Sequence, residues 1–201
     1  MIKTVIFDIG NVLVEFCWRK MFHGFGLEGE AFEKVANATI FHQAWQDLDQ
    51  GIITTEEAIE AFAKEAPEYR EYIERIYQDM TKMLEQFDYS IPWIKELKER
   101  GYRIYILSNW SKPGYDSCKD TVLSFLPLVD GVVFSYEEKV IKPDKKIYEI
   151  ICSRYDINPA EAVFIDDNEA NIVSAREFGL HGIHFKSYEQ GKEELEALLK
   201  E

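Results

Sequence analysis

The sequence predicts an α/β fold, with a mainly parallel sheet, helices on both of its faces and an inserted helical cap. Three observations predict this fold. Residues 3–12, KTVIFDIGNV, are an apolar, β-branched run that breaks off at Asp8, as expected of a parallel strand buried on both faces. Residues 15–88 contain no convincing β run. From Ser90 onward, strand-like and helix-like segments alternate, which is typical of a parallel sheet.

The insert is predicted to be helical because its apolar residues recur at helical spacing. Thr54 and Glu57 match a capping box at the start of one helix,. A second apolar stripe, from Tyr69 to Phe87, predicts one long amphipathic helix. The insert begins close to the C-terminal edge of the predicted sheet. We therefore expect it to cover that edge as a lid.

After the insert, four more strands are predicted, at residues 103–107, 131–135, 162–165 and 182–185. The helices between and after them are predicted at residues 92–100, 121–126, 143–151, 168–178 and 195–199. Gly101 and Gly179 follow helix ends, where glycine is common,. Pro143 stands at a helix start, where its missing N–H costs nothing,. The predicted division is a core of residues 1–15 and 89–201 and a cap of residues 16–88.

The composition limits the classes of function. With 46% hydrophobic and 14% aromatic residues the chain is expected to be globular,. A net charge of −14 would repel a nucleic-acid backbone,, and no apolar run is long enough to cross a bilayer,. Cys17, Cys118 and Cys152 are scattered without metal-ligand spacing, which suits a reducing cytoplasm. We expect a cytoplasmic protein with a small-molecule partner, and the sequence leaves the oligomeric state open.

Polar residues stand where the predicted strands end or where a helix begins. They are Asp8, Ser108-Asn109, Lys142 and Asp166-Asp167. In a parallel sheet all these positions meet at one edge. Taken singly, Lys142 could be a surface lysine and Asp166 a helix cap. Together, carboxylates can hold Mg²⁺, while a lysine and a hydroxyl can hold a phosphoryl oxygen. A remaining carboxylate can attack phosphorus and form an aspartyl-phosphate.

These residues resemble the motifs of the haloacid dehalogenase-like hydrolase superfamily. The four motifs occur in order as residues 8–12 (DIGNV), Ser108-Asn109, Lys142-Pro143 and residues 166–171 (DDNEAN). The resemblance covers the whole chain, including a cap inserted just after the first motif. It implies a Rossmann-like core and a phosphatase that uses Mg²⁺ and an aspartyl-phosphate intermediate.

The resemblance also implies a role for each matching residue. Asp8 would be the nucleophile and a Mg²⁺ ligand, with the Gly10 carbonyl and Asp167 as further ligands. Ser108 and the Asn109 amide would bind the phosphoryl group, and Lys142 would neutralise it. Asp166 would orient Lys142 or a metal-bound water. Asn171 would support the metal's outer shell.

One position departs from the family pattern. Most phosphatases of the superfamily carry a general acid and base aspartate two residues after the nucleophile, where this chain has Gly10. General acid help typically contributes about 10²–10⁴-fold in rate. Three explanations compete: a leaving group that needs little protonation, a substitute such as His42 or Glu15, or a slow or inactive protein. We favour the first, because residues 8–12 and the cap stretch 41–54 resemble bacterial α-glucose-1-phosphate phosphatases. The predicted substrate is a small phosphate monoester, in particular a sugar phosphate such as glucose 1-phosphate.

Three rival functions remain. A 2-haloacid dehalogenase would use the same aspartate without a metal, and Asp166-Asp167 would repel its anionic substrate. A phosphotransferase or mutase would be expected to keep the aspartate that Gly10 replaces. A catalytically weak binding protein would release no phosphate, so Asp8→Asn would change nothing measurable.

Overall fold

The computed structural model describes residues 1–200. Its central sheet has five strands, all parallel, in the order β5-β4-β1-β6-β7. The strands are β1 (Thr4–Phe7), β4 (Arg103–Ser108), β5 (Gly131–Phe134), β6 (Ala162–Asp166) and β7 (His181–His184). The most apolar segment, β1, lies in the middle, and all four of its residues are buried. The predicted fold class is confirmed.

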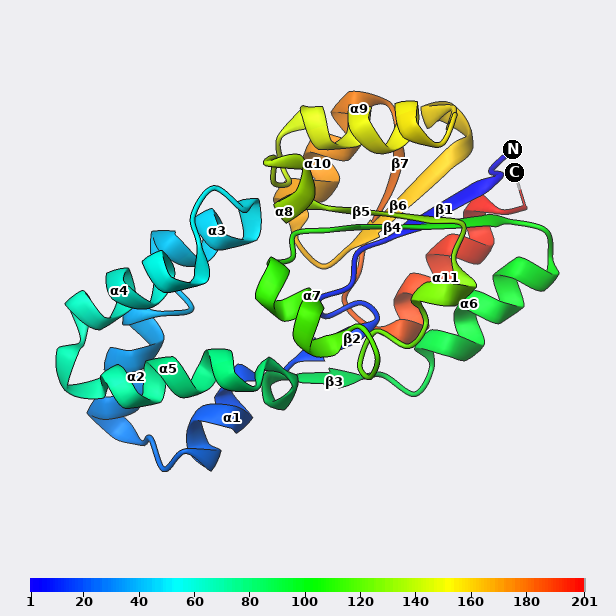
Figure 1. Ribbon diagram of the computed structural model, residues 1–201. Coiled ribbons are helices and arrows are strands. Elements are labelled where there is room, and N and C mark those ends of the chain that lie inside the picture. Colours follow the sequence, from blue (N-terminus) through cyan, green and yellow to red (C-terminus); the bar gives the residue numbers. More distant parts are fainter. Residues whose placement is uncertain (201) are drawn as a thin grey trace.

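Helices cover both faces of the sheet (Figure 1). Side chains alternate along β1, so Val5 and Phe7 face one layer and Ile6 the other,. The first layer contains α6 (Ser90–Glu99), α7 (Lys112–Cys118) and α11 (Tyr188–Leu198). The second contains α9 (Lys145–Arg154) and α10 (Glu169–Phe178). Both faces of β1 are therefore removed from water, which explains its uninterrupted apolar sequence.

The inserted segment forms a helical cap. Its helices are α1 (Trp18–Gly24), α2 (Gly29–Ala38), α3 (Gln43–Gln50), α4 (Thr55–Glu65) and α5 (Arg70–Gln78). They pack around hydrophobic clusters of their own, centred on residues such as Phe22 and Phe62. The predicted capping box of Thr54 and Glu57 is present at the start of α4. In Figure 1 these helices lie beyond the ends of the strands, on the side away from both termini.

The insert also contains two short strands, so the expectation of no β structure there is wrong. β2 (Val14–Phe16) and β3 (Leu84–Gln86) pair antiparallel where the chain enters and leaves the cap. Each has three residues, too few for an alternating pattern to stand out in the sequence. The pairing ties the two chain crossings together at the base of the cap.

The predicted long helix from Tyr69 to Phe87 is also wrong. Helix α5 ends at Gln78, Asp79 leaves the helical conformation with φ −154° and ψ 81°, and a 3₁₀ turn at Met80–Met83 leads into β3. The apolar stripe continues through the break because both the helix and the 3₁₀ turn bury residues against the cap cluster. Pairing of β3 with β2 requires extended backbone, and this tertiary contact outweighs the local helical spacing.

A third difference concerns the helix expected at residues 121–126. The helix lies earlier, as α7, and is capped at its N-terminus by Ser111, whose hydroxyl accepts a hydrogen bond from the Gly114 amide. Residues 121–125 form turns whose apolar side chains, Leu123 and Phe125, are buried against the first layer. Pro113 and Gly114 are poor helix-interior residues but are tolerated in a first turn.

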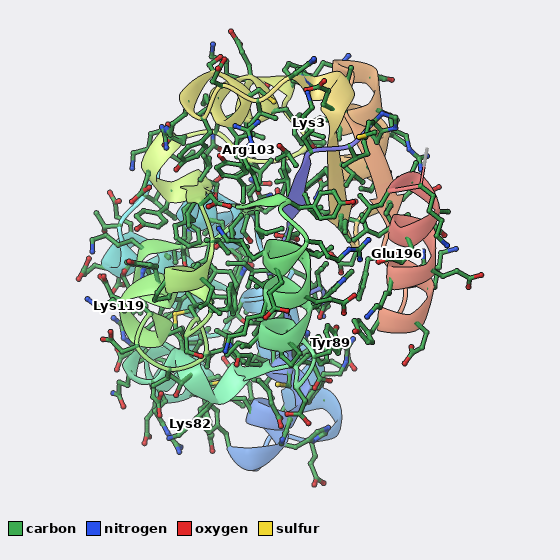
Figure 2. The ribbon with its side chains drawn as sticks, turned by 90° about the vertical axis from the view of Figure 1, so that its right-hand side faces the viewer. Lys3, Lys82, Tyr89, Arg103, Lys119 and Glu196 are labelled. Carbon is green, nitrogen blue, oxygen red and sulfur yellow. The ribbon has the colours of Figure 1, made fainter. Side chains whose placement is uncertain are left out.

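The two edges of the sheet are chemically different. Lys3 and Arg103 mark the edge where β1 and β4 begin (Figure 2), and the Arg103 amide donates to the Lys3 carbonyl over 3.0 Å. The opposite edge carries Asp8, Ser108 and Asp166 at or just after the strand ends. No helix within residues 1–200 is both long and apolar enough to span a bilayer.

Candidate active site

Asp8 follows β1 directly and is buried at the carboxyl edge of the sheet. Its Oδ1 accepts a hydrogen bond from Ser108 Oγ over 2.7 Å and lies 2.8 Å from Lys142 Nζ. Its Oδ2 has no hydrogen-bond partner within residues 1–200. Burial raises the pKa of Asp8 to about 7, against the opposing effect of the Lys142 charge,. One carboxylate oxygen is thus held by the protein, and the other is available to a ligand.

Lys142 supplies the positive charge beside Asp8. Its side chain is 1% exposed, and Nζ lies 2.7 Å from Asp166 Oδ2 and donates to the Leu107 carbonyl over 3.2 Å. Burial alone would lower its pKa, but the carboxylates of Asp166 and Asp8 outweigh burial and raise it,. Lys142 therefore stays protonated, as a fixed cation at the end of β1.

The backbone around Lys142 is fixed by Asn109. Asn109 Oδ1 accepts from the Lys142 amide over 2.8 Å, and Nδ2 donates to the Lys142 carbonyl over 3.1 Å. This pair of bonds joins the loop after β4 to the loop before α9. The side chain of Asn109 is used in placing the lysine, which leaves its backbone amide for a substrate.

Asp166 has no free oxygen. Oδ1 accepts from the Asn168 amide over 2.8 Å, and Asn171 Nδ2 lies 3.1 Å from both Oδ1 and Oδ2. With Lys142 on Oδ2, both oxygens are hydrogen-bonded. Of the two roles implied for Asp166, this geometry favours the orientation of Lys142, and Asn171 in turn orients Asp166.

Asp167 lies at the mouth of the same site. Its Oδ2 accepts from Asn11 Nδ2 over 2.9 Å, and its carbonyl oxygen lies 3.0 Å from His184 Nε2. Burial raises the pKa of Asp167, and the Asn11 hydrogen bond opposes that effect,. Asn11 itself adopts φ +53°, a left-handed conformation that asparagine tolerates better than most residues.

These carboxylates fit a divalent cation. Oxygen atoms of Asp8, Asp166 and Asp167 all lie within 4.8 Å of one another. Three carboxylates and one ammonium group leave two negative charges uncompensated at full ionisation. Oxygen donors of this kind suit Mg²⁺, a hard cation that keeps several waters. Asp8 and Asp167 each have an oxygen without a partner in residues 1–200, so they are the side chains that could ligate it.

A cavity of about 190 Å³ opens in front of Asp8, between the core and the cap. Its core side presents polar groups, and its cap side is mostly apolar and aromatic. The core contributes Asp8, Gly10, Asn11, Ser108, Asn109, Trp110, Ser111, Gly114 and Asp167. The cap and its connecting segments contribute Phe16, Trp45, Asp49, Met80, Met83 and Leu84. Small-molecule binding sites commonly combine a few polar groups with a mostly apolar lining.

The family model of the haloacid dehalogenase-like hydrolases matches residues 2–179. That range contains all the site residues predicted from the motifs and the whole cap. This chain belongs to the haloacid dehalogenase-like hydrolase family. The predictions of the family and of an enzyme are therefore confirmed.

Relatives of this hydrolase include phosphatases that match along nearly their whole length. The sesquiterpene phosphatase astK of Aspergillus oryzae is 25% identical over 90% of this chain and 89% of its own. The D-ribitol-5-phosphate phosphatase of Bacteroides thetaiotaomicron is 25% identical over 99% of both chains. The (S)-2-haloacid dehalogenase 4A of Burkholderia cepacia is 31% identical, but over 45% of this chain and 38% of its own.

Solved structures agree with the fold of this hydrolase. A predicted hydrolase of the same family from Porphyromonas gingivalis superposes with a TM-score of 0.77 at 24% identity, covering 100% of this chain and 99% of that one. A family enzyme from Bacteroides thetaiotaomicron, in complex with magnesium and inorganic phosphate, has a TM-score of 0.71 at 26% identity. It covers 94% of this chain and 96% of that one.

The residues predicted from the motifs of this hydrolase lie together at the carboxyl edge of the sheet. Those that line the cavity are Asp8, Gly10, Ser108, Asn109 and Asp167. Those buried behind its wall are Lys142, Asp166 and Asn171. The contacts of Lys142 and Asp166 described above connect the two groups.

Neither substitute suggested for the missing acid lines the cavity. The ring of His42 caps α3, where Nδ1 accepts from the Ala44 amide over 3.1 Å. Glu15 is exposed on β2. The structure instead places Asp49, a cap residue, in the cavity wall. Its sequence signal is slight: an acidic residue two positions before Gly51, which ends the helix.

Proposed function

We propose that this hydrolase is a Mg²⁺-dependent phosphatase of small phosphate monoesters that works through an aspartyl-phosphate on Asp8. The observation that carries the proposal is the asymmetry of the Asp8 carboxylate. Oδ1 is held by Ser108 and Lys142, and Oδ2 has no partner within residues 1–200. A nucleophile needs a fixed direction and a free electron pair. Asp8 has both, next to a cavity sized for a small ester.

The other residues have separate roles in this proposal. Mg²⁺, when bound by Asp8, Asp167 and the Gly10 carbonyl, would reduce the repulsion between the carboxylate and the phosphate dianion. Lys142 places a second positive charge at Oδ1 of Asp8. Ser108 and the backbone amide of Asn109 would hold the phosphoryl oxygens. Asp166 and Asn171 keep the Lys142 ammonium in position.

For the substrate we propose a sugar phosphate such as glucose 1-phosphate. The likeness of residues 8–12 and 41–54 to α-glucose-1-phosphate phosphatases supports it. The cavity is lined by two aromatic rings, those of Trp45 and Trp110, and by the polar groups of Ser111 and Asp49. Sugar rings combine apolar faces with hydroxyl groups, so the aromatic rings can pack on the faces and the polar groups can bind the hydroxyls.

The apolar part of the wall favours a second candidate, the monophosphate of an apolar alcohol. Phe16, Met80, Met83 and Leu84 line the cap side of the cavity. These side chains offer a hydrocarbon tail more contact than they offer a sugar. A comparison of sugar phosphates with a prenyl phosphate separates the two substrates.

The dehalogenase alternative receives less support. Asp166 and Asp167 lie within 4.8 Å of Asp8. A 2-haloacid carries a carboxylate, which would meet this group of acidic side chains without a cation between them. Dehalogenation needs no metal, so a chelator distinguishes the two reactions.

The experiment measures phosphate release from a panel of esters with and without Mg²⁺. The panel contains glucose 1-phosphate, ribitol 5-phosphate, a prenyl phosphate and p-nitrophenyl phosphate. We expect turnover that a chelator abolishes and that Asp8→Asn reduces to background. Asp156→Asn, an exposed change in a loop with φ +50°, is the matched control and should retain full activity. Turnover that survives in Asp8→Asn would refute the proposal, and lack of preference for the sugar phosphate would refute the finer assignment.

A further inference from the structure

The place of the missing aspartate is open space. A Cβ atom built on Gly10 would meet no atom within 4 Å, and Gly10 lines the cavity. No neighbouring core side chain therefore fills the position from which a proton could be given. A protein group that gives a proton to the leaving group must therefore stand elsewhere in the cavity wall.

Asp49 faces this space from the cap. It lies next to the last residue of α3 and lines the same cavity as Asp8 and Gly10. Its backbone is fixed against the core, because its carbonyl oxygen accepts from Ser135 Oγ over 2.5 Å. One residue later, Gln50 Nε2 donates to the Lys139 carbonyl over 2.8 Å. The contact between cap and core thus sets the position of this carboxyl group.

The surroundings of Asp49 favour its neutral form. Burial raises the pKa of Asp49 to about 7, and a weaker interaction with the Trp45 indole opposes the rise,. The nearby ammonium group of Lys139 donates to the Gly51 carbonyl. On α5, the buried hydroxyl of Tyr77 has no hydrogen-bond partner within residues 1–200. The negative charge of Asp49, when ionised, adds to the effect of burial in raising the pKa of Tyr77. A carboxyl of this kind can hold a proton near neutral pH and release it.

The other acidic groups of the cavity are already in use. Within residues 1–200 the carboxyl groups that line it belong to Asp8, Asp49 and Asp167. Asp8 is bound to Ser108 and Lys142, and Asp167 to Asn11. Asp49 is the remaining carboxyl group, and it approaches from the cap side, where the leaving group would lie.

We propose that Asp49 is the general acid and base of this enzyme and replaces the aspartate absent at position 10. This inference rests on the proposed phosphatase function. In the first step Asp8 Oδ2 bonds to phosphorus, the bond from phosphorus to the ester oxygen breaks, and the Asp49 carboxyl gives its proton to that oxygen. The products are the free alcohol, the aspartyl-phosphate and the Asp49 carboxylate.

In the second step the same residue acts as the base. A water molecule attacks phosphorus and loses a proton to the Asp49 carboxylate. The bond between phosphorus and Asp8 breaks, which releases inorganic phosphate and restores both aspartates to their starting forms. The residue is a catalytic one in this scheme, because its carboxyl group contacts the leaving oxygen and the attacking water.

The test compares two esters in Asp49→Asn. The leaving group of an alkyl ester such as glycerol 3-phosphate is a strongly basic alkoxide. The leaving group of p-nitrophenyl phosphate is a weakly basic phenolate that needs no proton. We expect the rate constant for formation of the aspartyl-phosphate, measured by rapid quench, to fall about 10²–10⁴-fold with the alkyl ester. With p-nitrophenyl phosphate the same step should stay close to the wild-type rate. Asp47→Asn makes the same substitution on the same helix outside the cavity and is the matched control.

Equal losses with both esters would mean that Asp49 merely supports the cap, and no loss with either would mean that it transfers no proton. Both results overturn the inference. A wild type without turnover on any ester would instead overturn the phosphatase function itself. A further variant adds Gly10→Asp to Asp49→Asn, since the space at Gly10 is open. Recovery of alkyl-ester turnover supports proton transfer as the lost function, and a double variant as slow as Asp49→Asn contradicts it.

Discussion

The ammonium nitrogen of Lys142 lies 2.8 Å from Oδ1 of Asp8, and the two side chains are 1% and 11% exposed. A buried carboxylate and a buried ammonium group are each costly alone, and each reduces the cost of the other. The same nitrogen is 2.7 Å from Asp166. The site is therefore a small charge network whose parts depend on one another, which gives clear expectations for single substitutions.

Lys142→Met should impair both turnover and stability. The change leaves Asp8 and Asp166 buried without their cation, and removal of one partner from a buried pair costs about 3–5 kcal/mol. Urea denaturation measures the free energy of unfolding, and phosphate release measures turnover. The matched control is Lys146→Met on α9, which breaks an exposed pair with Glu149 worth less than about 1 kcal/mol. Equal loss of stability in the two variants would contradict the buried network.

Asn11→Gly should weaken Mg²⁺ binding without unfolding the protein. Glycine accepts φ +53°,, so the change removes the two side-chain hydrogen bonds of Asn11, one donated to Asp167 Oδ2 and one accepted from the Phe16 amide. Loss of a partner that orients a metal ligand typically costs about 10–100-fold in metal affinity. Isothermal titration with Mg²⁺ measures the affinity, and Asp167→Asn should weaken it further. Unchanged affinity in both variants would exclude Asp167 as a ligand.

Asp49→Asn should alter how stability depends on pH. The pKa of Asp49 is about 7 in the folded protein, whereas an unfolded chain leaves this carboxyl group at its ordinary value of 3.8. Between these values the folded state binds more protons than the unfolded state, so stability falls as pH rises. Asparagine does not ionise, so the variant lacks this fall in stability. Its free energy of unfolding should therefore rise relative to that of the wild type as the pH rises from 3.8 to about 7. Thermal melts at several pH values measure the difference, and a difference that stays constant with pH would contradict the raised pKa.

Gly51→Ala should disturb the contact between cap and core. Gly51 has φ +71°, and a Cβ atom there would lie 2.4 Å from the Tyr136 carbonyl oxygen. Gly101 also ends a helix at positive φ, but a Cβ atom there would meet nothing within 4 Å. Gly101→Ala therefore carries only the backbone strain, about 1–2 kcal/mol. Gly51→Ala should cost more than that in a urea titration and should also lower kcat/KM, because it displaces neighbouring Asp49.

Much of the site could be predicted because strand ends are visible in the sequence. Buried parallel strands are continuous apolar runs, and a polar residue that ends such a run must lie at the carboxyl edge. Asp8, Ser108 and Asp166 can be placed together in this way. Lys142 can be placed at the same edge from its position at a predicted helix start, but no local pattern reveals that it is buried.

The cap was harder to predict because local and tertiary forces differ there. The apolar stripe from Tyr69 to Phe87 has helical spacing, yet residues Leu84–Gln86 near its end form the strand β3 because they pair with β2. The helix α7 starts with Lys112-Pro113-Gly114, residues that weaken a helix signal although they suit a first turn. Short elements of this kind take their form from the contacts they make.

The order of the strands and helices of the core, the family and the carboxylates at the strand ends follow from the amino-acid sequence alone, because hydrophobic periodicity and strand-end chemistry are local properties of the chain. Packing in three dimensions was needed to show which oxygen of Asp8 is held, how Asn11 reaches Asp167, and that Asp49 enters the cavity from the cap. Those relationships join residues far apart in the chain, and they arise only when the cap packs against the core and removes their charges from water.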